Sequence, residues 1–442
     1  MMNRHSSLSL AVLVVIILVA RAEPSAQIGG LPAGMPRGAR GLFGGGTGAG
    51  SGHNLDVFLS TAQGYDTDVL VDSSSPDGLS GAFSSVVTGG VDYRLNSRRA
   101  TVRGTYGSQL QYFRELGEFR SMSQRAGIGL SATLPGRNTL LMNQSATYSP
   151  SYYYGFAPRP VEVEPGDASQ DNIDYAAIDD REAWYQYDTT IRLTHSLTRG
   201  HDLVMRGNFT TTNFVHENLR RRDTSLYRVE GRYRWTTARN TSASVGYTYR
   251  TSDIQSVLGA TPTEHAVIFS VTHQRQLSAT RRASFEFRLG SSTTEAPFRS
   301  DQGELVLGRR YWLLAGITAS VPLSRDWYAR VNYTRSMEYI GTIDPVFADR
   351  VRAGIDGQLN RRVRLTSAIV FANGASSLDN LLFRTYTGTV EAYLAMTRAL
   401  ALYGNYRYYF YDYAGSGLEV PPDLKRSAVR IGLMLWVPVV GR

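Results

Sequence analysis

Apolar and polar residues alternate along most of this chain. In segments 227–235, 283–289, 351–359 and 429–437, one set of alternate positions is apolar or aromatic, and the other is mostly polar or charged. A period of two residues is typical of a β-strand with two different faces. The runs last roughly ten residues or more, which is long for a globular strand and is the length that a tilted strand needs to cross a bilayer. The pattern therefore predicts long β-strands.

Tight turns that carry arginine recur between these runs at fairly regular intervals. They lie at 96–99, 135–138, 198–201, 237–240, 279–282, 324–326, 360–362 and 397–399. Regular spacing indicates a repeated structural unit. Each unit holds two long alternating runs joined by a more variable polar connection. This is the pattern of an up-and-down antiparallel β-barrel, with short turns at one rim and longer loops at the other.

Two strands per unit, with one before the first pair and one after the last, predict about eighteen strands. Their expected ranges are 54–65, 82–95, 100–113, 121–134, 139–150, 183–197, 202–215, 224–236, 241–252, 263–276, 282–293, 309–322, 327–338, 348–360, 363–373, 383–396, 400–413 and 426–437. An even number of strands places both termini at the same rim. We expect this rim to face the periplasm and the longer loops to face the outside of the cell.

Alternation alone does not distinguish a soluble sheet from a membrane barrel, because either fold has one polar and one apolar face. Strand length, strictly alternating turn lengths and aromatic residues near the run ends favour the membrane barrel. The apolar faces would then contact lipid and the charged faces would line the lumen. A β-propeller with one blade per repeat is the alternative, but each blade needs four short strands where this chain has two long runs.

The N-terminal residues have the features of an export signal. Arg4 and His5 precede a short apolar run, and small residues follow, so residues 1–22 are predicted to be a signal peptide cut after Ala22, with Ala26 as the alternative. Residues 23–53 are rich in glycine and are expected to form a flexible arm. The arm is interpreted as a tether, with a plug or a partner-binding arm as the alternatives. The barrel is expected to span residues 54–442.

Composition narrows the choice of function. The chain has no cysteine, which excludes disulfides and thiolate metal sites, and its net charge of +9 comes almost wholly from arginine. The arginines are spread through every unit behind an export signal, which argues against nucleic-acid binding. The seven histidines are scattered, and no sequence pattern of a nucleophile, a metal site or a phosphate loop is present. We expect no catalytic residues, no metal and no cofactor.

Arginine dominates the faces predicted to line the lumen. With the apolar faces turned to lipid, the candidate selectivity residues are Arg94, Arg103, Arg192, Arg206, Arg228, Glu230, Arg232, Arg234, Arg250, Arg288, Arg352 and Arg407. An open lumen with this wall would attract anions. The alternative is that the arginines pair with carboxylates to fill a polar interior, for example as a ladder formed by Arg228, Glu230, Arg232 and Arg234.

One interval between turns is longer than the others, and its excess lies in the acidic third long loop, 150–182. The loop's candidate constriction residues are Glu162, Glu164, Asp167, Asp171, Asp174, Asp179 and Asp180. In architecture and loop position the chain resembles the general bacterial porins, in which the third external loop folds into the barrel opposite basic wall residues. The resemblance implies a transverse field that selects polar solutes. An acidic loop solvated outside the cell is the alternative.

The chain also resembles the β-barrel porins encoded near exopolysaccharide export systems, which combine a signal peptide with a long barrel rich in Arg and Tyr. It departs from many outer-membrane barrels in its ending, where Trp436 and Val437 precede a short tail in place of a terminal aromatic residue.

The sequence thus predicts a porin-like channel of the outer membrane that passes small hydrophilic solutes and prefers anions. A structural or export-associated barrel with a plugged lumen, serving polysaccharide secretion or adhesion, is the alternative. The expected partners are outer-membrane lipid, the barrel-assembly machinery and small polar solutes, with homo-oligomerisation left open.

Overall fold

A computed structural model describes residues 52–70, 79–113, 119–149, 183–215, 223–254, 261–279, 281–299, 305–339, 345–376, 382–414 and 423–440. The predicted signal peptide, nearly all of the glycine-rich arm and the acidic loop 150–182 lie outside these residues. No helix among the described residues is long and apolar enough to cross a membrane.

Eighteen β-strands make up the described part of the chain, as the sequence predicted. The first nine are β1 (Gly52–Leu70), β2 (Leu79–Asn96), β3 (Ala100–Phe113), β4 (Phe119–Leu134), β5 (Asn138–Ser149), β6 (Trp184–Thr198), β7 (His201–Phe214), β8 (Thr224–Ala238) and β9 (Thr241–Ile254). The others are β10 (Thr263–Gln276), β11 (Arg282–Arg299), β12 (Leu305–Pro322), β13 (Trp327–Tyr339), β14 (Pro345–Gln358), β15 (Val363–Ser376), β16 (Leu382–Ala395), β17 (Leu400–Ala414) and β18 (Asp423–Val440).

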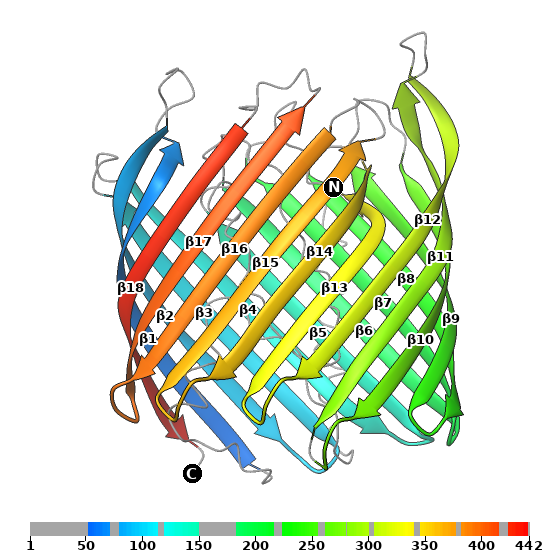
Figure 1. Ribbon diagram of the computed structural model, residues 1–442, viewed down its shortest axis with the longest axis horizontal. Coiled ribbons are helices and arrows are strands. Elements are labelled where there is room, and N and C mark those ends of the chain that lie inside the picture. The colour runs from blue at the N-terminus through cyan, green and yellow to red at the C-terminus, as the bar shows by residue number, and fades with distance from the viewer. Residues whose placement is uncertain are drawn as a thin grey trace, which may run out of the picture.

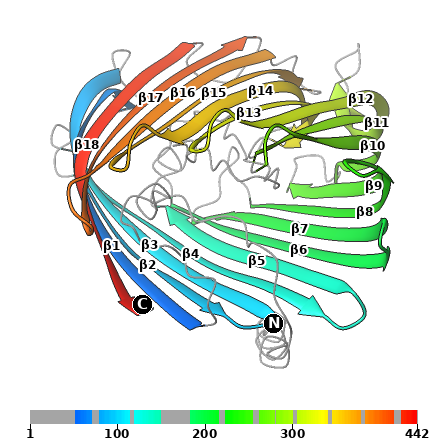
Figure 2. The ribbon, with the colours of Figure 1, turned by 60° about the horizontal axis from the view of Figure 1, so that its bottom comes forward.

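The strands form one closed antiparallel barrel in which each strand pairs with its neighbours in sequence (Figures 1 and 2). The last strand closes the sheet on the first, with Phe58 opposite Trp436 and Ala62 opposite Gly432. Closure satisfies the backbone hydrogen bonds of both terminal strands, which an open sheet would leave exposed at its edges. The predicted fold class, an all-β up-and-down barrel, is confirmed.

The outer surface of the wall is apolar. On β8, Tyr227, Val229 and Tyr233 point outward and are exposed, whereas Glu230 between them is buried. On β18, the exposed residues 429, 431, 433, 435 and 437 alternate with inward residues. A continuous apolar exterior of this kind is stable in lipid and not in water. The chain is therefore a transmembrane barrel of the outer-membrane type.

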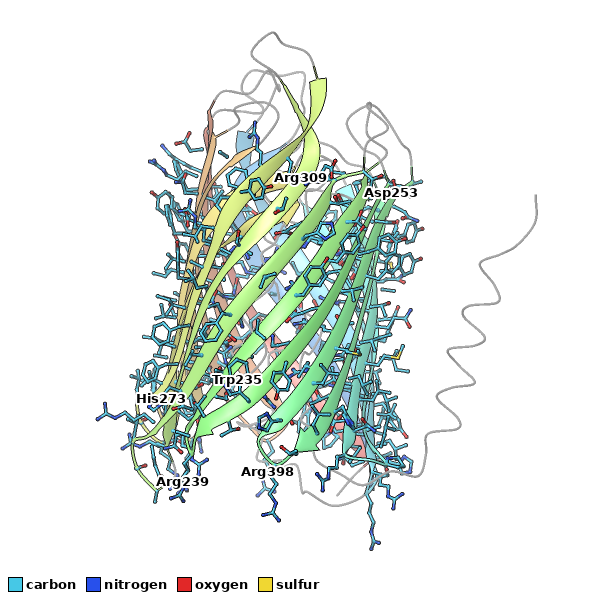
Figure 3. The ribbon with its side chains drawn as sticks, turned by 90° about the vertical axis from the view of Figure 1, so that its right-hand side faces the viewer. Trp235, Arg239, Asp253, His273, Arg309 and Arg398 are labelled. Carbon is cyan, nitrogen blue, oxygen red and sulfur yellow. The ribbon has the colours of Figure 1, made fainter. Side chains whose placement is uncertain are left out.

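All eight arginine-bearing turns lie at one rim, here called the turn rim. They join β2 to β3, β4 to β5 and so on to β16 and β17, through connections of two to five residues. Figure 3 shows Arg239 and Arg398 at this rim, with Trp235 and His273 nearby on the wall, and Asp253 and Arg309 at the opposite rim. The connections at the opposite rim have five residues or more.

The observed strand bounds agree most closely with the predicted bounds at the turn rim. β3 and β10 have the predicted bounds, but β1, β11 and β18 extend several residues beyond them at the opposite rim. Asp66, Val69 and Leu70 of β1 still pair with β2, across a register shift between Asp66 and Val69, although the regular apolar alternation has stopped. Strand pairing depends on backbone hydrogen bonds and continues above the lipid, where the apolar alternation stops.

Aromatic side chains form outward contacts near both rims. Rings of Tyr65 and Phe83, of Tyr148 and Tyr185, and of Phe209 and Tyr227 lie 4.8–5.0 Å apart near the opposite rim. At the turn rim, Tyr233 stacks on Trp235 at 5.7 Å. Amphipathic rings at these two levels form the aromatic girdles expected of a transmembrane barrel.

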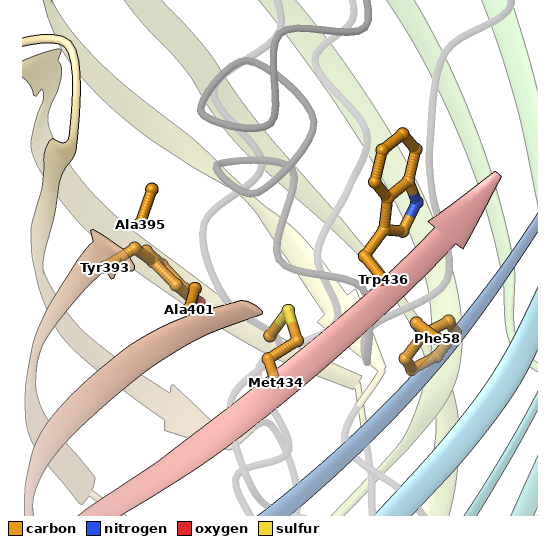
Figure 4. Packing of buried hydrophobic residues seen from close by; sticks show 6 residues of the cluster. All are labelled: Phe58, Tyr393, Ala395, Ala401, Met434 and Trp436. Atoms are coloured by element: carbon orange, nitrogen blue, oxygen red, sulfur yellow. The ribbon is translucent and has the colours of Figure 1, made fainter. Parts of the chain in front are cut away.

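An apolar patch lies on the inner face of the wall near the turn rim. It consists of Phe58 on β1, Tyr393 and Ala395 on β16, Ala401 on β17, and Met434 and Trp436 on β18 (Figure 4). Its position is set by the backbone, since the Trp436 amide donates to the carbonyl of Ala399 in the β16–β17 turn at 2.8 Å. The inner wall is therefore not uniformly polar.

The turn between β4 and β5 carries a backbone strain that can be tested. Gly136 has φ 73° and Arg137 has φ 62°, so two consecutive residues of this three-residue connection lie in the left-handed region. Arginine pays a steric cost in this left-handed region, whereas asparagine tolerates it. We expect Arg137→Asn to raise the free energy of unfolding by about 0.5–1 kcal/mol, measured by urea titration of the refolded barrel. Arg239→Asn is the matched control, because Arg239 has no positive φ, and an equal gain there would contradict the explanation.

Candidate functional site

The lumen wall carries the arginines that the sequence assigned to it. Each lies on the inward face of its strand, in positions that alternate with exposed apolar residues. The residues are Arg94 on β2, Arg103 on β3, Arg192 on β6, Arg206 on β7, Arg228, Arg232 and Arg234 on β8, Arg250 on β9, Arg288 on β11, Arg352 on β14 and Arg407 on β17. Glu230 lies among them on β8. The acidic residues of loop 150–182 lie outside the described residues, so the predicted constriction stays a prediction.

Several of these arginines are paired with carboxylates along the wall. Arg103 donates to Asp92 on the neighbouring strand from both Nε, at 3.0 Å, and Nη2, at 2.6 Å. Both side chains are buried, and Asp92 is only 1% exposed. Arg288 is bonded to Glu286 at 2.7 Å, and Arg407 lies 3.8 Å from Glu391. Pairs of this kind fill the polar interior. This is the alternative to an anion-attracting wall that the sequence left open.

The predicted ladder on β8 is present. Glu230 accepts from Arg228 at 3.3 Å and from Arg232 at 2.5 Å, so one carboxylate is shared by two guanidinium groups on its own strand. Arg234 pairs instead with Asp202 of β7. Inward residues on one strand are two positions apart, which brings their long side chains within reach of each other.

Five arginines form a continuous row across four neighbouring strands, here called the arginine row. They are Arg192, Arg206, Arg228, Arg232 and Arg250. Register places Arg192 opposite Arg206, Arg206 opposite Glu230, and Arg228 opposite Arg250. Arg228 and Arg232 pair with Glu230, and Arg250 pairs with Glu264. The five arginines of the row outnumber these two carboxylates.

Burial increases the influence of this charge. Glu230 and Arg250 are each 7% exposed, and the Nε atoms of Arg206 and Arg228 are buried with no hydrogen-bond partner. Charges in a confined lumen are less screened than charges on an open surface. A buried guanidinium whose donors are not all used favours a ligand that brings acceptor oxygens. The row is suited to hold small anions.

Sequence reasoning missed two partners of Arg250. Its Nη1 lies 3.3 Å from Glu264 on β10 and also donates to the main-chain carbonyl of Met337 on β13 at 2.7 Å. The inward position of Glu264 could have been read from the alternation with His265 and Val267. The contact with Met337 has no signal in the sequence, because it joins a side chain to a backbone atom on a distant strand.

The described residues offer no group of three or more His, Cys, Asp or Glu side chains placed to hold a metal ion. Histidines instead lie on the outer face near the rims, where His53 and His201 are each bonded to a tyrosine hydroxyl at 2.6 Å. The chemistry that the described lumen can perform is electrostatic attraction and hydrogen bonding to solutes.

Comparisons with known proteins find distant likenesses only. No family model matches the chain, and no curated protein matches it. Among solved structures, Pseudomonas aeruginosa OccK2 in complex with glucuronate has 8% identity and a TM-score of 0.44, covering 88% of this chain and 98% of that one. The ferric-catecholate import receptor Fiu of E. coli K12, in its open form, has 10% identity and a TM-score of 0.42, covering 88% and 82%. The fold assignment rests on the strand pairings themselves.

The buried Asp92–Arg103 pair gives a stability prediction. Removing one partner of a buried pair leaves an uncompensated charge, so we expect Asp92→Ala to lower the free energy of unfolding by about 3–5 kcal/mol. The double variant Asp92→Ala with Arg103→Met should recover most of the loss. Glu295→Ala is the control, because the Glu295–Arg309 pair is largely exposed, and we expect it to cost less than about 1 kcal/mol. Equal losses at the two sites, measured by urea titration, would refute the assignment.

Proposed function

We propose that this protein is a porin-like channel of the outer membrane that passes small hydrophilic solutes by diffusion and prefers anions. The single observation that carries the proposal is the arginine row, in which five guanidinium groups on β6 to β9 face the lumen, and three of them pair with the two carboxylates Glu230 and Glu264. A wall of this charge raises the local concentration of anions and lowers that of cations.

The apolar exterior and the predicted export signal support the proposed location. A barrel with this exterior must sit in lipid, and residues 1–22 have the features of a cleaved signal peptide. We place the turn rim, which also holds the first residues of β1, on the periplasmic side. The longer connections then face the outside of the cell, as in bacterial barrels.

Selectivity would arise in two steps. The excess charge of the arginine row draws an anion into the lumen, and hydrogen bonds from guanidinium donors replace part of its hydration. Because five arginines lie in register over several strands, a solute can move from one to the next without binding tightly to any of them. This combination of attraction and multiple weak sites is what conduction requires.

Ion preference in planar bilayers tests the proposal. In a salt gradient, we expect the reversal potential of the parent channel to have the sign that shows a preference for anions over cations. Arg228→Glu and Arg232→Glu should each reduce this potential or invert its sign, because each replaces a positive charge in the row by a negative one. Arg239→Glu is the control, because this substitution makes the same change of charge at an exposed turn outside the lumen. An unchanged preference in both row variants would mean that these side chains do not line the path.

A second candidate function is a structural or export-associated barrel with a plugged lumen. The observation that favours it is the apolar patch on the inner wall, because Phe58, Met434 and Trp436 face inward and are at most 9% exposed. Apolar side chains are poor lining for an aqueous path and are suited to packing against another segment.

Deletion of the segment before β1 separates the two candidates. If the barrel is an open channel, the full chain should show conductance steps, and deletion of residues 26–51 should leave them nearly unchanged. If that segment plugs the lumen, the full chain should be silent and the deletion should open it. Silence of the full chain, of this deletion and of a second deletion of residues 150–182 would rule out the channel.

A further inference from the structure

The barrel wall is split between β12 and β13. These strands pair from Pro322 opposite Tyr328 up to Ala315 opposite Arg335, and the pairing stops there. Beyond this point β12 continues and pairs with β11 as far as Leu305. β13 continues to Tyr339 and pairs with β14. Figure 1 shows the outer ends of β13 and β14 curling away from the line of the wall, beside the longer β12.

The freed ends of β13 and β14, residues 335–339 and 345–349, form a two-stranded ribbon, here called the inner hairpin. It lies against the inside of the wall. The Phe347 ring stacks on Trp312 with centroids 4.4 Å apart and an angle of 19°. Trp312 belongs to the inward face of β12, because Tyr311 and Leu313 on either side are 72% and 61% exposed. The outer face of the hairpin therefore packs on the inner face of β12.

The inner hairpin reaches further, across β11 to β9. The Sδ atom of Met337 lies 3.9 Å from Oγ1 of Thr294, an inward and buried residue of β11. The carbonyl of Met337 accepts the hydrogen bond from Arg250 on β9. Three strands separate β9 from β13 along the wall, so this contact can form only through the inside of the barrel. Met337 and Ala348 are 3% and 1% exposed, which confirms that the hairpin is closely packed.

We propose that the inner hairpin narrows the lumen beside the arginine row, and that Arg250 is the positioning residue that holds it there. This inference rests on the proposed channel function for its effect on solutes. Arg250 is suited to the role because it faces a carboxylate, Glu264, and a carbonyl at the same time. Both contacts come from Nη1, so one guanidinium nitrogen links the hairpin to β10.

The arrangement joins the size limit of the channel to its charge selectivity. Arg250 belongs to the arginine row, with Arg228 opposite it in register. A solute that passes the row must therefore pass the narrow section between the row and the hairpin. The class of solute that fits is a small anion with few atoms around its charged group, such as a short carboxylate or an inorganic anion. Bulky anions would be attracted to the row and stopped by the hairpin.

Cross-linking tests the position of the hairpin without relying on conductance. Because the chain has no cysteine of its own, Thr294→Cys and Met337→Cys together supply a single pair of thiols. The short bis-alkylating agent dibromobimane should join them in membranes and become fluorescent. Replacing the Met337 side chain leaves its carbonyl in place, so the bond from Arg250 is retained. Thr389→Cys with Met337→Cys is the control pair, because Thr389 is an inward residue of the distant strand β16 and should not react.

Release of the hairpin is tested in the same double-cysteine background. A charge-assisted hydrogen bond contributes enough that its loss in Arg250→Gln should lower the ratio of held to released hairpin by about tenfold or more, and the cross-linking rate should fall. Trp312→Ala removes the stack on Phe347 through a different contact and should act in the same direction. Arg232→Gln removes a charge from the same row without touching the hairpin and should leave the rate unchanged.

Conductance then links the hairpin to the size limit. Arg250→Gln and Trp312→Ala should each raise single-channel conductance and admit larger anions, and cross-linking residues 294 and 337 in either variant should restore the parent values. Failure of the parent pair to cross-link, or folded variants with unchanged cross-linking and conductance, would overturn the inference. If the parent pair cross-links and Arg250→Gln slows it but nothing conducts, the hairpin position stands and the proposed channel function fails.

Discussion

Pairing of β1 with β18 closes the sheet, and the rest of the structure depends on this contact. In lipid, an unpaired strand edge leaves backbone donors and acceptors without partners, and each costs several kcal/mol. Closure removes both edges at once, and the seam includes Phe58 opposite Trp436 near the turn rim. A closed wall of this many strands is too wide for its wall side chains to fill completely, so inward residues line a space as well as forming a core.

The split between β12 and β13 respects the same constraint. It begins at Ala315 and Arg335, and above it β12 carries Arg309, whose side chain is 60% exposed. Charged, exposed residues mark the part of the strand that stands in water, where an unpaired edge is hydrated at little cost. The wall opens toward the opposite rim, where a hairpin can turn inward close to water, whereas the same opening at the middle of the wall would place free backbone groups in hydrocarbon.

Much of this architecture follows from local sequence. A period of two residues gives the strands, and tight turns fix their order, so the strand number and the inward face of the candidate lumen arginines could be predicted. The predicted strand ends at the opposite rim were less accurate, because pairing continues there beyond the apolar pattern, as at Val69 and Leu70. The inner hairpin could not be predicted at all. Its contacts join Met337 to Arg250 and Phe347 to Trp312, which are distant in sequence, and the period of two suits a wall strand and a folded-in strand equally well.

The ion pairs of the inner wall differ in how the arginines share their carboxylates. Arg103 donates to Asp92 from two nitrogens, and this pair is buried in the wall. On β8, one carboxylate is shared by two arginines, and on β9 Arg250 divides its donors between Glu264 and a neutral carbonyl. A carbonyl accepts a hydrogen bond without cancelling charge, so the contact that holds the hairpin does not itself reduce the positive charge of Arg250. In the proposed channel, the same guanidinium would set the width of the lumen and contribute to a preference for anions.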